Sequence, residues 1–308
     1  MKVVIPDLVS NSYFPAIAAV EMGFFKEEGL DAELELIYPV QKCYEALRDG
    51  KCDFVGGSAH SVPSAFAEWK GAKLLGTLGK HTYWFLIMRS DLKVKRGDVA
   101  SVKGKRIGAA PLIDIGLIEM LKECGIDPKR DNVQIAPPPM PANPAGVSFG
   151  VNAAKAMEEG KIDGFWANGM GAEVAVTRGI GTMVLDARRG DGPASLRGYT
   201  FGTLVTRADL VDKEPEKAAA AVRALVKTHK ALKADPKRAT KVGEKWFPAE
   251  EASLIATLIE RDLPYYDASI SKETFDTMCK FSQATGISKG VGKYEDVVAT
   301  QFANLWKA

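Results

Sequence analysis

The sequence lacks the features that mark a membrane-spanning or nucleic-acid-binding protein. No apolar run approaches the length that spans a bilayer. Lys and Arg number 41 against 39 Asp and Glu, which leaves a formal charge of +2 and no basic tract. This balance argues against nucleic acid as a partner. A chain of 308 residues, 46% hydrophobic and 26% charged, is instead typical of a globular protein with two lobes.

Signatures of the common enzyme classes are also missing. The G-x-S-x-G, H-E-x-x-H and P-loop motifs do not occur in the sequence. With three histidines in the chain, carboxylates would have to supply most general bases. The sequence therefore identifies no catalytic residue, and we expect a protein that is not an enzyme.

Cysteine is scarce, and its spacing does not match the usual metal sites. The four cysteines are Cys43, Cys52, Cys124 and Cys279. They form no C-x-x-C pair and have no histidine at metal-ligand spacing, so we expect neither a metal site nor a cofactor. Cys43 and Cys52 flank one helix-to-strand turn and could pair in an exported chain. We favour free thiols, because the geometry of a helix does not readily bring the two within reach.

The N-terminal segment does not resemble a signal peptide. It has one basic residue, and Pro6, Asp7 and Asn11 interrupt any apolar core. Two interpretations follow. The protein is either cytoplasmic, or it is a mature chain whose export signal has been replaced by Met1.

One phrase, A-[LM]-x-x-G-K-x-D, occurs twice. It reads ALRDGKCDFVGG at residues 46–57 and AMEEGKIDGFWANG at residues 156–169. Upstream of these, FKEEGLD at residues 25–31 and LKECGID at residues 121–127 both indicate a helix that ends at Gly before a strand. The second half also contains a proline-rich insert, residues 137–150. Each half reads strand, helix, strand, helix, strand, which implies parallel pairing with right-handed crossovers.

A third repeat marks the points where the chain crosses between the halves. IMRSDL at residues 87–92 matches VTRADL at residues 205–210, and each follows an apolar, β-rich run. We interpret them as two hinge strands. The second lobe, residues 91–199, is then an insertion in a first lobe of residues 1–90 and 200–308, which ends in helices. The predicted fold class is α/β, with a parallel-dominated sheet and flanking helices in each lobe.

Ligand-binding loops are expected at the carboxyl ends of the strands, in a cleft between the lobes. In the first lobe, one such loop carries Ser10, Asn11, Ser12 and Tyr13. Helix capping explains one of its polar residues but not all three together with a tyrosine, so we favour a binding loop. A second loop carries Gly57, Ser58 and Ala59. It is either a turn that approaches a ligand or a tight turn capped by Ser58.

The corresponding loops of the second lobe lie within residues 109–116 and 166–173. Their candidate ligand contacts are Ile113, Asp114, Trp166 and Asn168. Asp114 is either a helix N-cap or an acceptor for a ligand N–H group. Trp166 is either a core residue or a flat wall against which a ligand stacks. We expect the proline-rich insert to form a lip of the cleft.

Aromatic residues near the crossing points are further candidates. Strand alternation places His81 and Tyr83 on one face and Trp84 on the other. Tyr199 and Phe201 occupy the same place on the return strand. We expect His81, Tyr83 and Phe201 to line the cleft.

Four phrases resemble one known family. GFFKEEGLDAELE, ALRDGKCDFVGG, GKRIGAAP and GKIDGFWAN look like those of type II periplasmic solute-binding proteins. More narrowly, they resemble the nitrate/sulfonate/taurine and thiamine-pyrimidine-precursor family of ABC-transporter substrate-binding proteins. The resemblance covers nearly the whole chain. It implies two lobes that close on a small molecule, ligand contacts on the loops described above, and delivery of the ligand to a membrane permease.

The resemblance also narrows the range of possible ligands. Sulfonate binders carry a Gly/Ser/Thr-rich loop where this chain has AAPLIDIG, which disfavours nitrate and simple sulfonates. We therefore expect a periplasmic or extracytoplasmic monomer that binds a small organic solute with an aromatic or heteroaromatic ring. The alternative is a cytosolic enzyme on the same fold, similar to a pyrimidine synthase or a desulfinase. The cysteine-rich motif of the former and the first-loop cysteine of the latter are absent here.

Overall fold

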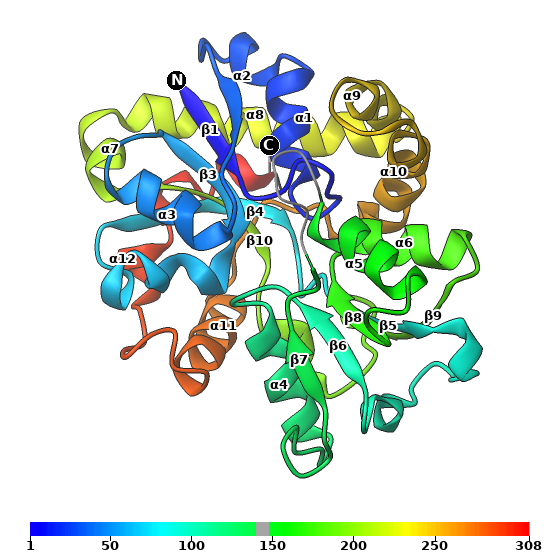
Figure 1. The fold of residues 1–308 in the computed structure, drawn as a ribbon. Coiled ribbons are helices and arrows are strands. Elements are labelled where there is room, and N and C mark those ends of the chain that lie inside the picture. The colour runs from blue at the N-terminus through cyan, green and yellow to red at the C-terminus, as the bar shows by residue number, and fades with distance from the viewer. Residues whose placement is uncertain (140–147, 308) are drawn as a thin grey trace. The chain divides into compact units, whose positions relative to one another are not determined.

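Two compact units make up the chain. The structure is a computed structural model that describes residues 1–139 and 148–307. One unit contains residues 1–81 and 198–308, and the other contains residues 82–197 (Figure 1). The chain therefore enters the second unit once and leaves it once.

A five-stranded sheet in the order β2-β1-β3-β10-β4 forms the centre of the first unit. Its strands are β1 (Lys2–Ile5), β2 (Glu33–Leu36), β3 (Phe54–Ser58), β4 (Ala72–Gly79) and β10 (Gly202–Arg207). β1 is parallel to β2 and β3, as the sequence predicted, whereas β10 is antiparallel to β3 and β4. β3 is buried throughout, as expected of a strand covered on both faces.

The sheet of the second unit has the same topology, in the order β7-β6-β8-β5-β9. Its strands are β5 (Phe85–Arg89), β6 (Arg106–Ala109), β7 (Gln134–Ala136), β8 (Gly164–Ala167) and β9 (Gly181–Asp186). β6 is parallel to β7 and β8, and β5 is antiparallel to β8 and β9. The two predicted halves are therefore confirmed as two α/β units built from the same strand order.

The third repeat corresponds to two equivalent strands. β5 and β10 are each the antiparallel fourth strand of a sheet. β5 comes before the other strands of its sheet along the chain, and β10 comes after the others of its own. β5 thus belongs to the second unit, whereas the sequence analysis placed residues up to 90 in the first lobe. The difference arises because an apolar strand carries no local signal of which sheet it joins.

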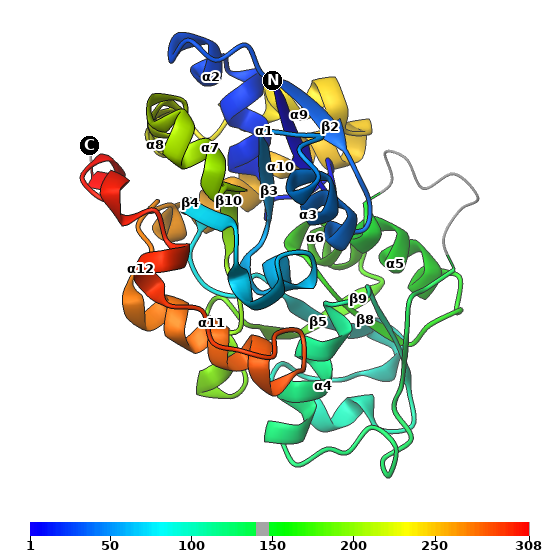
Figure 2. The same ribbon diagram turned by 90° about the vertical axis from the view of Figure 1, so that its left-hand side faces the viewer.

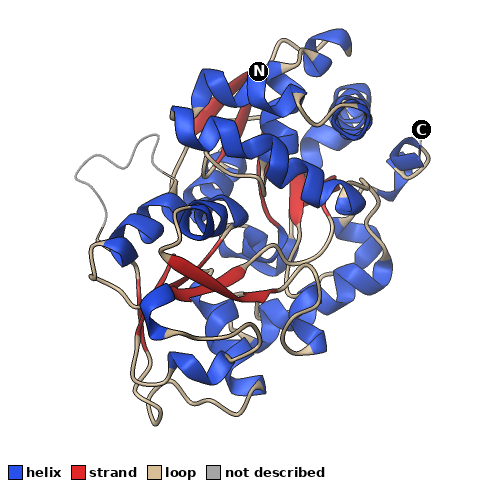
Figure 3. Cartoon of the chain, turned by 90° about the vertical axis from the view of Figure 1, so that its right-hand side faces the viewer, coloured by secondary structure: helices blue, strands red, loops and turns tan. Residues whose placement is uncertain are grey.

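Helices cover the sheet in each unit, so the apolar core lies between helices and strands (Figure 3). The helices of the first unit are α1 (Phe14–Glu21), α2 (Phe24–Glu27), α3 (Val40–Arg48), α7 (Ala208–Lys213), α8 (Pro215–Ala234), α9 (Arg238–Trp246), α10 (Ala249–Asp262), α11 (Lys272–Ala284) and α12 (Tyr294–Val297). Those of the second unit are α4 (Asp114–Glu123), α5 (Phe149–Glu158) and α6 (Gly169–Thr177). Short 3-10 helices are η1 (Ala59–Ser64), η2 (Ala67–Trp69), η3 (Ser90–Leu92), η4 (Val99–Val102), η5 (Ala194–Gly198), η6 (Leu263–Tyr265), η7 (Thr300–Phe302) and η8 (Leu305–Lys307).

The long helix α8 holds the helical layer of the first unit together. It begins with Pro215 in the first turn, where a missing N–H costs nothing. Its alanine-rich face is buried, and it packs against α1, α2 and α7 (Figure 2). Small side chains allow these helices to approach closely. Within the described residues, no helix is both long enough and apolar enough to cross a bilayer.

The repeated Gly-Lys-x-Asp phrase forms the same turn in both units. In the first copy, Gly50 follows α3 with a φ of +71°, a value that glycine adopts without strain. Asp53 then accepts the backbone N–H of Lys2 at 2.9 Å and the ammonium group of Lys217 at 2.8 Å. The aspartate thus attaches the start of β3 to the start of β1.

The second copy makes the equivalent contacts. Gly160 has the same φ of +71°, and Asp163 accepts the backbone N–H of Arg106 at 2.9 Å. The guanidinium of Arg106 also bonds both carboxylate oxygens, at 3.0 and 2.9 Å. These bonds lower the pKa of Asp163. The phrase recurs because each sheet has the same anchor between two neighbouring parallel strands, β1 and β3 in one sheet and β6 and β8 in the other.

The proline-rich insert lies between β7 and α5. Residues 140–147 of it lie outside the described residues, so the prediction of a cleft lip stays a prediction.

Candidate functional site

The loop that joins β1 to α1 buries three polar side chains without using them to cap the helix. Ser10, Asn11 and Ser12 are each at most 3% exposed. Ser10 Oγ accepts the backbone N–H of Ser12 at 3.1 Å. The N-cap of α1 is Tyr13, and the helix start has no side-chain capping bond in the described residues. Capping therefore does not account for Asn11 and Ser12, which supports the prediction of a binding loop.

Two atoms of this loop are buried without a partner. Asn11 Nδ2 donates to Oδ2 of Asp262, the last residue of α10, at 2.7 Å. Within the described residues, Asn11 Oδ1 and Ser12 Oγ have no hydrogen-bond partner. Leaving a buried polar atom unpaired costs roughly 1–3 kcal/mol, so each such atom calls for an explanation such as a ligand, an ion or a water. These atoms mark the candidate site in the first unit.

A buried histidine organises the loop after β3. His60 Nδ1 lies 2.9 Å from Oγ1 of Thr200, and Nε2 lies 3.3 Å from Oγ of Ser61. Ser58 Oγ lies 2.8 Å from the same Ser61 oxygen. Both ring nitrogens of His60 are thus hydrogen-bonded, as in a structural histidine. Ser58 is held by this network rather than by a helix-capping bond.

Both loops of the first unit meet the start of β10. The backbone N–H of Ala59 donates to the carbonyl of Phe201 at 3.0 Å. A Cβ atom on Gly202 would lie 3.0 Å from the carbonyl oxygen of Ser12. The structure therefore brings together Ser12, Ala59 and Phe201, with the Phe201 side chain fully buried.

The glycines of β3 have a packing reason of their own. A Cβ atom on Gly56 would lie 2.8 Å from Cβ of Ala16 in α1, and one on Gly57 would lie 2.6 Å from the hydroxyl oxygen of Tyr44 in α3. Both distances are too short for real atoms. The close approach that the sequence suggested for a ligand at Gly57 is made by Tyr44, whose hydroxyl donates to the carbonyl of Ser58 at 2.8 Å.

In the second unit, three aromatic rings form what we call the aromatic cluster: Tyr83, Trp84 and Trp166. The ring centroids of Tyr83 and Trp84 are 6.1 Å apart, and those of Trp84 and Trp166 are 5.7 Å apart. The Trp84 ring packs directly on Gly116 of α4. Only glycine fits there, since a Cβ atom at this position would lie 2.3 Å from the ring. The guanidinium of Arg188 lies over the Tyr83 ring, 5.8 Å from its centroid. The cluster thus connects the segment before β5 and the end of β8 with α4.

Trp166 is a core residue whose indole N–H group is left without a hydrogen-bond partner among the described residues. Its side chain is fully buried, which agrees with the core alternative raised by the sequence. Its indole Nε1, however, has no hydrogen-bond partner in the described part of the chain. Tryptophan is only a donor at this atom, so a ligand acceptor could complete it.

The starts of α4 and α6 are organised differently. The N-cap of α4 is Ile113, which makes no side-chain capping bond, so the N-cap alternative for Asp114 is wrong. Asp114 is the first residue of the helix, and its carboxylate accepts the backbone N–H of Ile115 at 2.9 Å. Burial raises the pKa of Asp114, although nearby backbone N–H groups oppose this. Asn168 Oδ1 accepts the N–H of Met170 at 3.2 Å and caps α6. Ligand roles for Ile113, Asp114 and Asn168 stay predictions.

The alternation predicted for His81 and Tyr83 is wrong. β5 begins only at Phe85, and His81 has a φ of +67°, so the residues between them are not a strand. The His81 ring packs edge-on against Tyr265 with centroids 5.8 Å apart, within the first unit. Tyr83 belongs to the second unit. The local pattern missed the bend because the positive φ falls on a histidine, a residue that does not ordinarily signal one.

Several buried charged residues were not predicted, and two of them interact with candidate residues. Asp262 and Arg188 are each 2% exposed. A signal for Asp262 exists, since it follows Ile255, Leu258 and Ile259 at helical spacing and so shares their buried face. Arg188 follows the end of β9 and has no comparable signal.

Neither a thiolate nucleophile nor a metal centre is assembled by the described residues. Burial raises the pKa of Cys52 and Cys279 to about 12 and that of Cys43 further. The pKa of Cys124 is also raised by burial. Thiols of this kind are poor nucleophiles at neutral pH. No group of three or more His, Cys, Asp or Glu in these residues could hold a metal ion.

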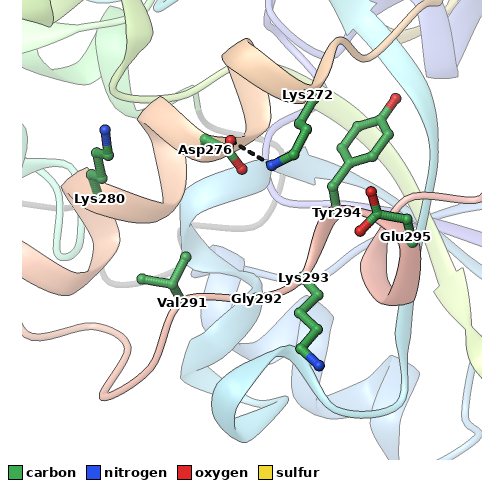
Figure 4. A pocket seen from close by; sticks show the side chains of 8 residues that line it. All are labelled: Lys272, Asp276, Lys280, Val291, Gly292, Lys293, Tyr294 and Glu295. Carbon is green, nitrogen blue, oxygen red and sulfur yellow. Dashed lines mark hydrogen bonds and ion pairs between the residues drawn. The ribbon is translucent and has the colours of Figure 1, made fainter.

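A surface hollow of about 390 Å³ on the first unit involves none of the predicted residues. It is lined by Lys272, Asp276, Lys280, Val291, Gly292, Lys293, Tyr294 and Glu295 (Figure 4). Lys272 and Asp276 form an ion pair across it at 2.7 Å. Its remaining lysines are exposed surface residues, and we assign it no function.

Comparison with known proteins places the chain in context. Residues 10–239 match the model of a protein family described as NMT1/THI5 like. No curated protein matches the sequence.

Several solved structures share the fold. The periplasmic aliphatic sulphonate binding protein SsuA from Escherichia coli has 13% identity and a TM-score of 0.71, over 100% of this chain and 99% of that chain. The ligand-binding component of an ABC-type import system from Staphylococcus aureus, with zinc bound, has 15% identity and a TM-score of 0.73, over 100% and 99%. The desulfurization enzyme DSZB has 15% identity and a TM-score of 0.64, over 98% and 97%. At these identities the likeness is one of fold.

Proposed function

Because the chain belongs to the NMT1/THI5-like family, we propose that it is the substrate-binding component of an ABC transporter and captures a small organic solute. The relatives described as binding or import components support this role at the level of the fold. One observation in the chain carries the proposal. The strand-end loops contain buried polar atoms without partners among the described residues: Asn11 Oδ1, Ser12 Oγ and Trp166 Nε1.

The proposal includes the ligand contacts predicted from the sequence. They are Ser10, Asn11, Ser12, Tyr13, Gly57, Ser58, Ala59, His81, Tyr83, Ile113, Asp114, Trp166, Asn168 and Phe201. A ligand that contacts residues of both units would bind a closed arrangement better than an open one and would shift the population toward closure. The aromatic cluster supports the ring system expected of the ligand.

A transport role implies a partner and a location. We propose that the protein acts as a monomer outside the cytoplasm and delivers its ligand to a membrane permease. The relatives that are periplasmic or import-system components support this.

The alternative is an enzyme on the same fold, which the likeness to a desulfurization enzyme keeps in view. The chemistry of the cysteines disfavours it. The loop after β1 contains serine and asparagine but no cysteine. Cys43, Cys52 and Cys279 are buried thiols with raised pKa values, so none is prepared as a nucleophile.

The test is a ligand screen on the full chain. Thermal shift followed by native mass spectrometry would be run with aromatic acids, pyrimidines and sulfonates. We expect at least one compound to raise the melting temperature and to be released unchanged. Chemical conversion of a bound compound would contradict the proposal and favour the enzyme.

The placement of the site is tested by a conservative variant. Trp166→Phe keeps a buried ring but removes Nε1–H, and we expect about a fivefold to tenfold loss of affinity for the hit compound. The matched control is Trp69→Phe. Trp69 is also fully buried with an unpartnered Nε1 in the described residues, but it packs against Phe275 and is not among the predicted ligand contacts. Equal effects of the two changes would contradict the placement.

A further inference from the structure

The Asn11–Asp262 contact fixes which end of the Asn11 amide is available. A carboxylate only accepts hydrogen bonds, so the 2.7 Å contact to Asp262 identifies the bonded atom of Asn11 as the nitrogen. The amide oxygen is then the end that points elsewhere. Both residues are at least 97% buried, which prevents water from exchanging freely with this pair.

The other end of the Asn11 amide, its oxygen, is a hydrogen-bond acceptor to which no described group donates. Asn11 Oδ1 has no hydrogen-bond partner in the described residues, and neither has Ser12 Oγ next to it. A carbonyl oxygen can be satisfied only by an N–H or O–H group. The Ser12 hydroxyl can donate or accept a hydrogen bond, so it is compatible with any ligand group that donates to Asn11 Oδ1.

The charge of the loop after β1 also favours a hydrogen-bond donor or a cation over an anion. Residues 6–14 contain Asp7 and no lysine or arginine. Asp7 is 8% exposed. Burial and, secondly, the charge of Asp7 raise the pKa of Tyr38, which places the Asp7 carboxylate near that phenol. Asp262, which bonds the Asn11 amide nitrogen, adds a second buried carboxylate to the surroundings of this loop.

An anion would be unfavourable here. A sulfonate or nitrate oxygen would face the Asn11 carbonyl oxygen, which can only accept, and it would find no cationic side chain on this loop. Building on the proposed function, we infer that the first unit binds an N–H donor group of the solute, such as an amidinium or a protonated amine. Asp262 is the positioning residue that sets this preference, by holding the Asn11 amide with its oxygen outward.

The experiment compares matched probes on the full chain. Benzamidine and benzylamine would be titrated against benzenesulfonate by isothermal calorimetry. The inference expects at least tenfold tighter binding of the amidine or amine. The reverse order would overturn the inference and leave solute binding intact, and so would failure of both donor probes to bind at millimolar concentration. Conversion of a probe would instead contradict the proposed function.

Asp262→Asn tests the positioning role. With two amides facing each other, the Asn11 group can reverse and present its nitrogen, so the preference for donor probes over benzenesulfonate should fall about tenfold. The matched control is Glu260→Gln, which removes the same charge from an exposed position of α10. An unchanged preference in Asp262→Asn, or an equal change in the control, would overturn the role of Asp262.

Ser12→Ala separates ligand binding from folding and serves if Asp262→Asn does not fold. Since Ser12 Oγ has no partner within the described residues, its removal should not lower the melting temperature of the ligand-free protein. It should weaken binding of the donor probe about fivefold. A lowered melting temperature with unchanged affinity would contradict the ligand role of this loop.

Discussion

At the scale of single residues, close contacts decide several positions that composition leaves open. Gly57 is an example, because its place in β3 directly faces the hydroxyl of Tyr44. Asn11 is another, because its neighbours on α10 determine the direction of its amide. His229 is a third: burial lowers its pKa to about 4, and it donates from Nε2 to the carbonyl of Leu78 at 3.1 Å.

Gly57→Ala should destabilise the protein by about 1–3 kcal/mol, because the new Cβ would lie 2.6 Å from the Tyr44 hydroxyl oxygen. Tyr44→Phe removes that oxygen. The double variant should therefore be more stable than the sum of the two single effects predicts. Urea unfolding measures all three. Gly290→Ala is the control, since its Cβ would meet nothing closer than 3.6 Å. Simple additivity would contradict the clash.

His229→Gln should reduce the acid sensitivity of the fold. The histidine pKa falls from 6.5 to about 4 on folding, so its neutral form contributes stability above pH 6.5 that is lost as the pH falls toward 4. The loss is up to about 3 kcal/mol. The variant should therefore lose less stability than the parent between pH 7 and pH 4.5, as measured by urea unfolding. Lys230→Gln on the same helix is the control, and identical pH profiles would refute the assignment.

At the scale of elements, each unit uses one aspartate to join two neighbouring parallel strands. Asp53 joins β3 to β1, and Asp163 joins β8 to β6. Each accepts, at 2.9 Å, the backbone N–H of the residue that begins the neighbouring strand. Burial alone would raise the pKa of Asp53, but the bonds from Lys217 and Lys2 outweigh it and lower it. The shared anchor explains why the phrase survives in both halves while the residues after it differ.

Asp53→Asn and Asp163→Asn should each destabilise the protein by about 1–3 kcal/mol, because each removes charge-assisted hydrogen bonds at a partly buried site. Denaturant unfolding of each variant measures the cost. Asp212→Asn at an exposed position should change stability by less than about 0.5 kcal/mol. If only one of the two variants is destabilised, the proposal that the two turns have equivalent roles is contradicted.

At the scale of the whole molecule, chain connectivity makes the units unequal. All strands of the second sheet lie within residues 82–197. The first sheet needs β10, which pairs with both β3 and β4 but comes from beyond the second unit. One unit is therefore complete in a single segment, and the other requires two distant segments of the chain.

A fragment of residues 82–197 should fold cooperatively by itself, because it contains its own sheet and the aromatic cluster. A fragment of residues 1–81 should not, since β4 would have no partner strand. Near-ultraviolet circular dichroism and urea titration distinguish the outcomes. Cooperative folding of the shorter fragment would contradict the role assigned to β10.

The sequence by itself determined the order of strands and helices and the parallel pairing within each half. These depend on local signals: helix-ending glycines such as Gly50 and Gly160, and short apolar runs of strand length. It also determined the loops that carry the candidate site, because strand ends follow from strand order. Asn11, Ser12 and Trp166 were identified in this way.

Only the tertiary structure decided which sheet β5 joins, which way the Asn11 amide points and how deeply Trp166 is buried. Each depends on partners far away in the chain: Asp262 is separated from Asn11 by 251 positions, and Trp166 packs on Trp84. Such contacts leave no periodic trace in the sequence, because side-chain patterns report the face on which a residue lies but not the atoms that it meets there.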